Sequence, residues 1–249
     1  MSRNWDVTIE EQNKPAFYEQ DFGATTIMTL ANFPDEVLPL LQMESLITYE
    51  AMIYFRCELL VELGCYDGRA LEIARLLNTR YLGIDLNPRA IQLLRIRIER
   101  EGMTDRADTI IGDVLAHTTR GQTLIDSRTL CLLPFNLLGN FRDPTPLLKQ
   151  LAMLNVTAVI CVFSNSSEAT RVRQDYYLRC GVQQLERHPL EDGMVFTGAE
   201  GFYSRSYTRE SFHALLAQCG LTIVRASESL LAYCATVKLD TKYSEVGCE

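Results

Sequence analysis

Three carboxylates stand at or near the ends of three successive apolar runs, and a pair of glycines follows the first of them. The first run contains Glu62 and leads to Gly64 and Gly68, the second ends at Asp85 and the third at Asp113. Short apolar runs of this kind are typical of buried parallel strands, whose carboxyl ends meet at one edge of a sheet. We therefore expect the acids and the glycine turn to lie together, where carboxylates can accept hydrogen bonds from a ligand's hydroxyl and amino groups.

The spacing of the glycines distinguishes two kinds of nucleotide-binding turn. Glycine after a strand lets the backbone turn sharply and approach a ligand, and the next helix points its first N–H groups at that ligand. A dinucleotide fingerprint needs glycine at the first, third and sixth positions. Counted from Gly64, the third and sixth positions hold Tyr66 and Arg69, so the sequence excludes that fingerprint.

The combination of Glu62, Gly64 and Gly68 with the two later acids resembles class I S-adenosylmethionine (SAM)-dependent methyltransferases over residues 35–239. The resemblance implies SAM as the cofactor, with Asp85 on the ribose hydroxyls and Asp113 on the adenine amino group. The family usually has glycine where Tyr66 stands, and we expect Tyr66 to cover part of the cofactor. The cofactor-binding residues implied are Glu62, Gly64, Cys65, Tyr66, Gly68, Asp85, Leu86, Asp113, Val114 and Leu133.

Strand-like and helical patterns alternate from Glu58 onward, which predicts an α/β fold with a doubly wound, mostly parallel sheet. The resemblance implies seven strands that end in an antiparallel pair. We expect an N-terminal extension and helix in residues 1–57, folded over the cofactor side, and a SAM-binding methyltransferase domain in 58–239. A lid-like insert after the fifth strand should occupy 164–207, and 240–249 should be a tail.

Local signals set the expected limits of two helices. A helical pattern opens at Pro34-Asp35-Glu36 and runs to Met52, with Pro39 tolerable only near the first turn. Asn87-Pro88 places a capping side chain and then proline at a helix start.

Composition excludes several classes of partner and site. The chain has 249 residues and a net charge of −8, which argues against a nucleic-acid partner. Four of the eight cysteines, Cys65, Cys131, Cys161 and Cys234, lie in or beside apolar runs, where free cysteine behaves as a small hydrophobe. We therefore predict no disulfide. The absence of a Cys-x-x-Cys pair and of a His/Cys cluster predicts no metal.

The first twenty or so residues are polar, and no apolar run approaches transmembrane length. We therefore expect a cytoplasmic protein with no membrane partner. A small-molecule substrate is the expected partner, and a homodimer is left open.

Methyl transfer depends mainly on holding the nucleophile in line, and a base is needed only if the nucleophile is protonated. Asn136, in the turn after the fourth strand, and His188, in the insert, are the candidate catalytic residues. His117 is a further candidate base, whereas His213 fits a structural position on a helix. No acid accompanies Asn136, so a metal-assisted reaction is not expected.

The stretch Leu137–Phe141 resembles the Gly-Asn segment of small-amine N-methyltransferases, so we expect methyl transfer to a small-molecule amine or hydroxyl in specialised-metabolite biosynthesis. Two alternatives stay open: a non-methylating cyclase or SAM-binding regulator, which Tyr66 favours, and a nucleic-acid or protein methyltransferase. Arginine and tyrosine in the insert suit a polar or carboxylate-bearing substrate. The candidate substrate-binding residues are Phe135, Asn140, Arg171, Tyr176 and Tyr177.

Overall fold

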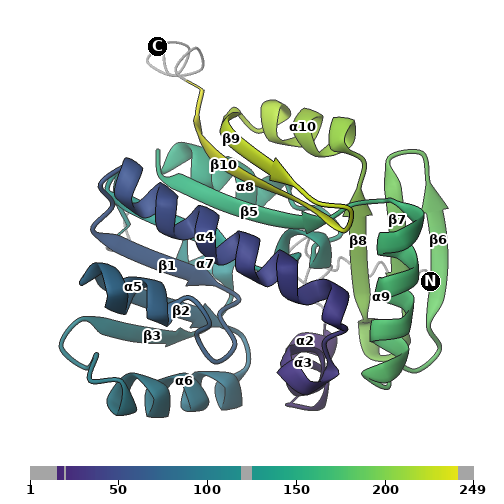
Figure 1. Ribbon diagram of the computed structural model, residues 1–249, viewed down its shortest axis with the longest axis horizontal. Helices are drawn as coiled ribbons and strands as arrows, with labels where there is room; N and C mark the ends of the chain where they lie inside the picture. Colours follow the sequence, from purple (N-terminus) through teal and green to yellow (C-terminus); the bar gives the residue numbers. More distant parts are fainter. Residues whose placement is uncertain (1–15, 20, 119–124, 241–249) are drawn as a thin grey trace, which may run out of the picture.

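The computed structural model describes residues 16–19, 21–118 and 125–240, and its centre is a seven-stranded sheet (Figure 1). The strand order is β3-β2-β1-β4-β5-β10-β9, with the first five strands parallel and the last two antiparallel to their neighbours. This confirms the predicted sheet and its final antiparallel pair. The strands are β1 (Leu59–Leu63), β2 (Arg80–Asp85), β3 (Ala107–Ile111), β4 (Thr129–Leu133), β5 (Thr157–Phe163), β9 (Leu221–Glu228) and β10 (Ala232–Leu239).

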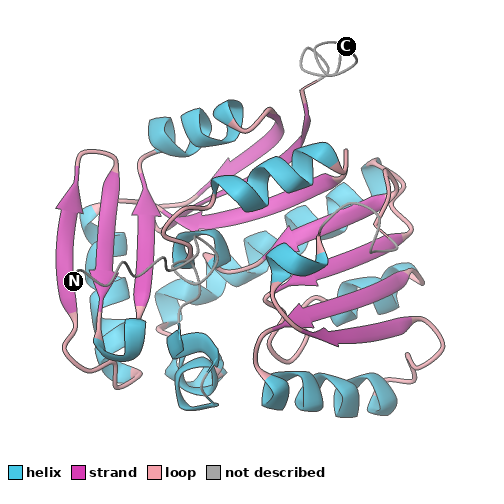
Figure 2. Cartoon of the chain, turned by 180° about the vertical axis from the view of Figure 1, so that it is seen from behind, coloured by secondary structure: helices cyan, strands magenta, loops and turns pink. Residues whose placement is uncertain are grey.

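Helices cover both faces of this sheet because successive strand side chains point to opposite sides. In β1, Leu60 packs in the hydrophobic core of one face, while Val61 and Leu63 pack in the core of the other. The first core includes side chains of α4 (Leu38–Tyr54), α5 (Leu71–Leu77) and α6 (Pro88–Arg100). The second includes side chains of α7 (Val114–His117), α8 (Thr145–Met153) and α10 (Arg209–Gln218), which the reverse view shows (Figure 2).

The capping signals act as the sequence predicts at α6, but α4 begins later than expected. The Asn87 side chain accepts hydrogen bonds from the backbone N–H groups of Arg89 and Ala90, and Pro88 occupies the first helical position. In α4, Pro39 lies within the first turn, and residues 35–37 form a separate 3-10 turn, η2 (Asp35–Val37). Proline is tolerated only where its missing N–H needs no partner, so the regular helix starts just before it.

The segment between β5 and α10 forms a second, three-stranded antiparallel sheet beside the end of the first (Figure 1). The strands of this sheet are β6 (Glu186–Leu190), β7 (Gly193–Thr197) and β8 (Tyr203–Tyr207), and the segment also contains α9 (Ser167–Arg179) and the turn η4 (Ala199–Gly201). Arg173 of α9 is fully buried, and its guanidinium donates to the Ser204 carbonyl at 2.8 Å. The same guanidinium lies 4.8 Å from the ring centroid of Phe196. One buried cation therefore joins α9 to β7 and β8.

The prediction of no disulfide is wrong, because Cys161 and Cys234 are bonded to each other. Each was correctly placed in a buried strand, but β10 runs antiparallel to β5 with Cys234 directly opposite Cys161. Residues directly opposite on antiparallel strands have their Cβ atoms close together. The pairing follows from the strand register, which the cysteine positions alone do not reveal.

No helix in the described part of the chain has both the length and the apolar character that a membrane crossing requires.

The disulfide can be checked by counting thiols. Of the seven cysteines in the described residues, only Cys57, Cys65, Cys131, Cys180 and Cys219 should react with an alkylating reagent in the unfolded, unreduced chain. Reduction should lower the unfolding free energy by about 2–4 kcal/mol, because a long loop is no longer closed in the unfolded chain. Mass spectrometry identifies the protected pair, and protection of any pair other than Cys161 and Cys234 would contradict the assignment.

Candidate active site

A cavity of about 870 Å³, including its open mouth, lies where β1, β2, β3 and β4 reach their carboxyl ends. In a doubly wound sheet this is the edge where ligands bind, next to the point at which the strand order reverses. Its walls come from the loops after these strands and from α2 (Ala16–Glu19) and α3 (Asp21–Met28). The lining residues are Tyr18, Met28, Gly64, Tyr66, Asp85, Leu86, Asp113, Val114, Leu115, Pro134, Phe135, Leu137, Asn140 and Phe141.

The loop after β1 is held in a conformation that glycine favours. Gly64 has φ +64°, and a Cβ on it would lie 2.8 Å from Leu137 Cδ1, so glycine is what lets the Leu137 side chain pack against this loop. Tyr66 also has positive φ, +49°, which is unusual for a bulky residue. Its backbone N–H donates to Asp85 Oδ2 at 2.8 Å, so the acid at the end of β2 helps to hold this strained residue.

Asp85 is suited to accept further hydrogen bonds. Its Oδ1 accepts from the Asn87 N–H at 2.8 Å, and each carboxylate oxygen retains another lone pair. Burial raises the pKa of Asp85, and the N–H groups of Asn87 and Tyr66 counter that rise by stabilising the charged form. Asp113 follows β3, caps α7 by accepting from the Leu115 N–H at 2.9 Å, and lines the same cavity.

Glu62 lies behind the loop and does not line the cavity. Its Oε2 accepts hydrogen bonds from the Ala70 N–H at 3.1 Å and the Tyr81 hydroxyl at 2.6 Å. Burial raises its pKa to about 7, partly offset by the bond from Tyr81. Glu62 therefore supports the glycine loop from the side that faces away from the cavity. Of the other predicted cofactor residues, Cys65, Gly68 and Leu133 lie outside the lining.

The turn after β4 forms the facing wall and contains two consecutive residues in the left-handed region, Phe135 (φ +43°) and Asn136 (φ +67°). The Phe135 N–H donates to Glu44 Oε2 at 2.6 Å. The other oxygen of Glu44 pairs with Arg69 at 2.5 Å, in the loop after β1. Glu44 is 2% exposed, and burial raises its pKa while Arg69 lowers it. One buried carboxylate thus connects both walls to α4.

Asn136, a predicted catalytic residue, does not reach the cavity. Its side chain is buried, where Oδ1 accepts from the Phe163 N–H at 3.0 Å and Nδ2 donates to Ser204 Oγ at 3.1 Å. These bonds attach the turn to the end of β5 and to β8. Asn136 therefore positions its neighbours Phe135 and Asn140, which do line the cavity.

His188, the other predicted catalytic residue, is also remote from the cavity. It lies on β6 with its ring half-exposed, and its Nε2 is 2.9 Å from Thr197 Oγ1. His117 folds back on the end of β3, where a Cβ on Gly112 would lie 2.3 Å from its Nε2. Neither histidine is among the lining residues.

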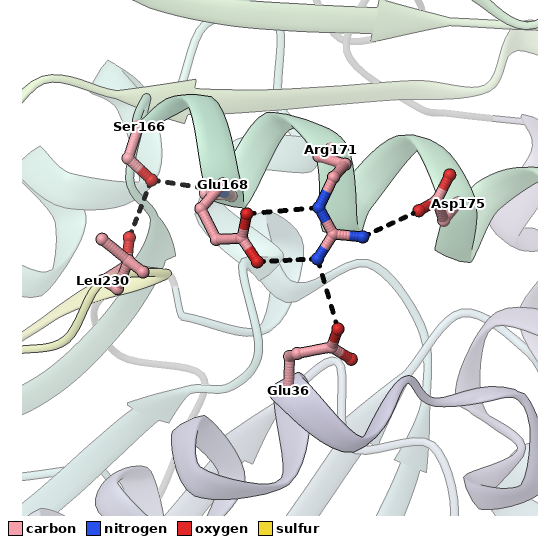
Figure 3. A network of polar contacts seen from close by, with 7 residues as sticks. Glu36, Ser166, Glu168, Arg171, Asp175 and Leu230 are labelled. Atoms are coloured by element: carbon pink, nitrogen blue, oxygen red, sulfur yellow. Dashed lines mark hydrogen bonds and ion pairs between the residues drawn. The ribbon is translucent and has the colours of Figure 1, made fainter.

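Of the predicted substrate residues, Phe135 and Asn140 line the cavity, whereas the three on α9 do not. Figure 3 shows Arg171 pointing toward carboxylates, with ion pairs to Glu168 at 2.6 Å, Asp175 at 3.2 Å and Glu36 at 3.3 Å. Tyr176 and Tyr177 are buried in an aromatic cluster. No described residue of 164–207 lines the cavity, so this segment is not brought over it.

Helices α2 and α3 supply the lining residues that the sequence did not identify. Tyr18 of α2 and Met28 of α3 line the cavity, and the Tyr18 hydroxyl donates to Asn140 Oδ1 at 3.2 Å. The sequence predicted that the N-terminal extension folds over the cofactor side, but it did not single out these two residues. Leu137 and Phe141, by contrast, lie within the Gly-Asn stretch that the sequence had singled out.

The described residues contain no cluster of acidic, histidine and cysteine side chains that could hold a metal ion. None of the described residues that line the cavity is a lysine, an arginine or a histidine. Its ionisable side chains are two carboxylic acids and two tyrosines: Tyr18, Tyr66, Asp85 and Asp113.

The sequence matches no protein-family model and no curated protein sequence. Many solved structures share its fold. One is a 1,6-didemethyltoxoflavin-N1-methyltransferase of Burkholderia thailandensis, solved with S-adenosylhomocysteine. It is 14% identical to this chain with a TM-score of 0.62, and the match covers 96% of this chain and 92% of the methyltransferase. The CcbJ methyltransferase of Streptomyces caelestis is 12% identical with a TM-score of 0.56, covering 83% and 99%.

A mitomycin 7-O-methyltransferase is 14% identical with a TM-score of 0.59 and covers 88% of this chain and 61% of its own. The chain therefore has the fold of class I SAM-dependent methyltransferases.

The connection through Glu44 predicts a large cost for removing it. Glu44→Ala should lower the unfolding free energy by about 2–4 kcal/mol in chemical denaturation, because it leaves the Phe135 N–H and Arg69 without their partner. The matched control on the same helix is Glu50→Ala, whose partner Arg225 is 57% exposed. It should cost less than about 1 kcal/mol. Equal effects of the two substitutions would show that Glu44 does not hold the site together.

The raised pKa of Glu62 predicts a pH-dependent stability. Between pH 4.5 and about 7, Glu62 keeps its proton in the folded chain but has released it in the unfolded chain. The contribution of Glu62 to the unfolding free energy is therefore complete below pH 4.5 and is lost as the pH rises through about 7. Glu62→Gln cannot lose that proton. Between pH 4.5 and 8 its stability relative to wild type should therefore rise by up to about 3 kcal/mol.

Urea denaturation across this pH range measures the difference. Glu72→Gln, on the exposed face of α5, is the matched control and should follow the wild-type profile. A constant difference between Glu62→Gln and wild type would contradict the assignment of the titration to Glu62.

Proposed function

We propose that this chain binds SAM in the cavity and transfers its methyl group to a small-molecule amine or hydroxyl. The observation that carries the proposal is the convergence of Gly64, Asp85 and Asp113 on one cavity at the carboxyl edge of the sheet. Three structures with this fold carry methyltransferase names, one for transfer to a nitrogen and one for transfer to an oxygen. Both kinds of acceptor therefore remain within the proposal.

The residues present fit this cofactor. SAM supplies an electrophilic methyl group on a positively charged sulfur. Asp85 would accept hydrogen bonds from ribose hydroxyls, and Asp113 from the adenine amino group, with Val114 and Leu115 offering apolar surface. Gly64 lets the Leu137 side chain, which also lines the cavity, approach the loop backbone closely, since a Cβ there would lie 2.8 Å from Leu137 Cδ1. Tyr66, 9% exposed, would cover part of the cofactor in place of the usual glycine.

The chain's own contribution to the reaction would be positioning and exclusion of water. Phe135 and Pro134 face the glycine loop across the cavity, on a turn fixed by Glu44 and Asn136. The described lining offers no histidine or lysine as a base. We infer that the acceptor reacts through a lone pair that is available at the working pH. Specialised-metabolite biosynthesis is the setting that such a small acceptor suits.

The cofactor assignment is tested at Asp85. Asp85→Ala should weaken binding of SAM and of S-adenosylhomocysteine by about 1–3 kcal/mol in calorimetry, because the ribose hydroxyls lose a buried acceptor. Asp108→Ala is the control: this exposed acid lies on β3 and is not among the lining residues. Unchanged affinity in Asp85→Ala would remove the proposed cofactor site. Firm binding of SAM with no S-adenosylhomocysteine formed from any acceptor would instead favour a non-methylating role.

A further inference from the structure

Among the described lining residues that are not assigned to the cofactor, two have polar side chains, Tyr18 and Asn140. The Tyr18 hydroxyl donates to Asn140 Oδ1 at 3.2 Å, and both residues line the cavity. They come from opposite parts of the chain, α2 and the turn η3 (Leu137–Asn140), so the pair also joins the covering helix to the turn after β4. Asn140 is half-buried.

The direction of this hydrogen bond determines what the pair offers to a ligand. Because the hydroxyl hydrogen points to Asn140, the Tyr18 oxygen presents its lone pairs and acts as an acceptor. Among the described residues, none accepts a hydrogen bond from Asn140 Nδ2, so the amide presents a donor. Burial raises the pKa of Tyr18, so the hydroxyl keeps the proton that it donates. The pair therefore presents one acceptor beside one donor.

Apart from this pair, the described lining residues that are not assigned to the cofactor are apolar. They are Met28, Pro134, Phe135, Leu137 and Phe141, and two of them are aromatic. A sugar carries hydroxyls on every side and would need more polar partners than this wall provides, because each desolvated hydroxyl left unpaired costs binding energy. A flat ring with polar atoms along one edge gives up few hydrogen bonds to water on entering such a site, because the polar pair replaces them.

We propose that Tyr18 and Asn140 form the recognition site for the methyl acceptor, and that the acceptor is a flat, uncharged heterocycle of the lactam type. Its ring N–H would donate to the Tyr18 oxygen, and its adjacent carbonyl would accept from Asn140 Nδ2, so the methyl group would go to a different ring atom that has a free lone pair. An anionic ring is disfavoured because the described lining holds two carboxylates and no cationic side chain. This inference rests on the proposed function, since it assigns the acceptor half of the same cavity.

Two nearly isosteric probes test the donor–acceptor match. 2-Quinolinone has the lactam edge, and coumarin has a ring oxygen in place of the N–H. With the protein saturated with S-adenosylhomocysteine, ligand-observed NMR titration should show 2-quinolinone binding about tenfold more tightly than coumarin, the size expected for one hydrogen bond to a buried partner.

Two variants assign that preference to the pair. Tyr18→Phe removes the acceptor and keeps the ring, so it should bind the two probes equally. Asn140→Asp replaces the donor with an acceptor and keeps a partner for the Tyr18 hydroxyl, so it should weaken both probes about tenfold. Tyr203→Phe is the matched control: this tyrosine lies on β8, is not among the lining residues, and should retain the wild-type preference.

Calorimetry with S-adenosylhomocysteine on each variant separates this inference from the proposed function. Normal cofactor binding with no preference between the probes, with no binding of either, or with a preference that survives Tyr18→Phe would overturn the acceptor assignment alone. If the wild-type chain does not bind S-adenosylhomocysteine, the proposed function itself is overturned.

Discussion

The site depends on one buried carboxylate. Glu44 projects from α4 and is bonded at one oxygen to Arg69 and at the other to the Phe135 N–H. Arg69 belongs to the loop after β1, and Phe135 belongs to the turn after β4. The parallel sheet brings these two segments to the same edge, but it does not fix the space between them. Because a buried carboxylate must keep its partners, Glu44 holds both walls of the cavity at a fixed separation from a third element.

Hydrogen bonds with neighbouring elements, Glu44 among them, also hold the unfavourable backbone conformations around the cavity. Tyr66, Phe135 and Asn136 all have positive φ without being glycine. Such residues cost on the order of 1–3 kcal/mol each and persist only where surrounding bonds determine them. Here the N–H of Tyr66 donates to Asp85, and that of Asn136 donates to the Cys161 carbonyl. The strain is concentrated where the loops meet the cavity, and the carboxylates of Asp85 and Glu44 together with the Cys161 carbonyl sustain it.

The sequence predicted the features that depend on local periodicity. Apolar runs ending in acids identified β1 to β3 and placed Gly64, Asp85 and Asp113 at one cavity. It did not predict contacts made by segments distant in the chain. Glu44, Tyr18 and the Cys161–Cys234 disulfide each depend on a partner that packing or strand register selects. Asn136 and His188 were chosen for their chemistry, and the structure uses the first as a support and leaves the second on a separate sheet.

The charges that line the cavity set a further constraint on what it can hold. Asp85 and Asp113 are its acids, and no described lining residue is cationic. Inside a partly dehydrated site such charges interact over several ångströms, so the cavity would favour a cationic ligand and disfavour an anionic one. A sulfonium cofactor is cationic at the reacting atom, whereas its demethylated product is not. The same two acids that would recognise the ribose and the adenine would therefore also help to select the charged cofactor over the neutral product, without any residue reserved for that discrimination.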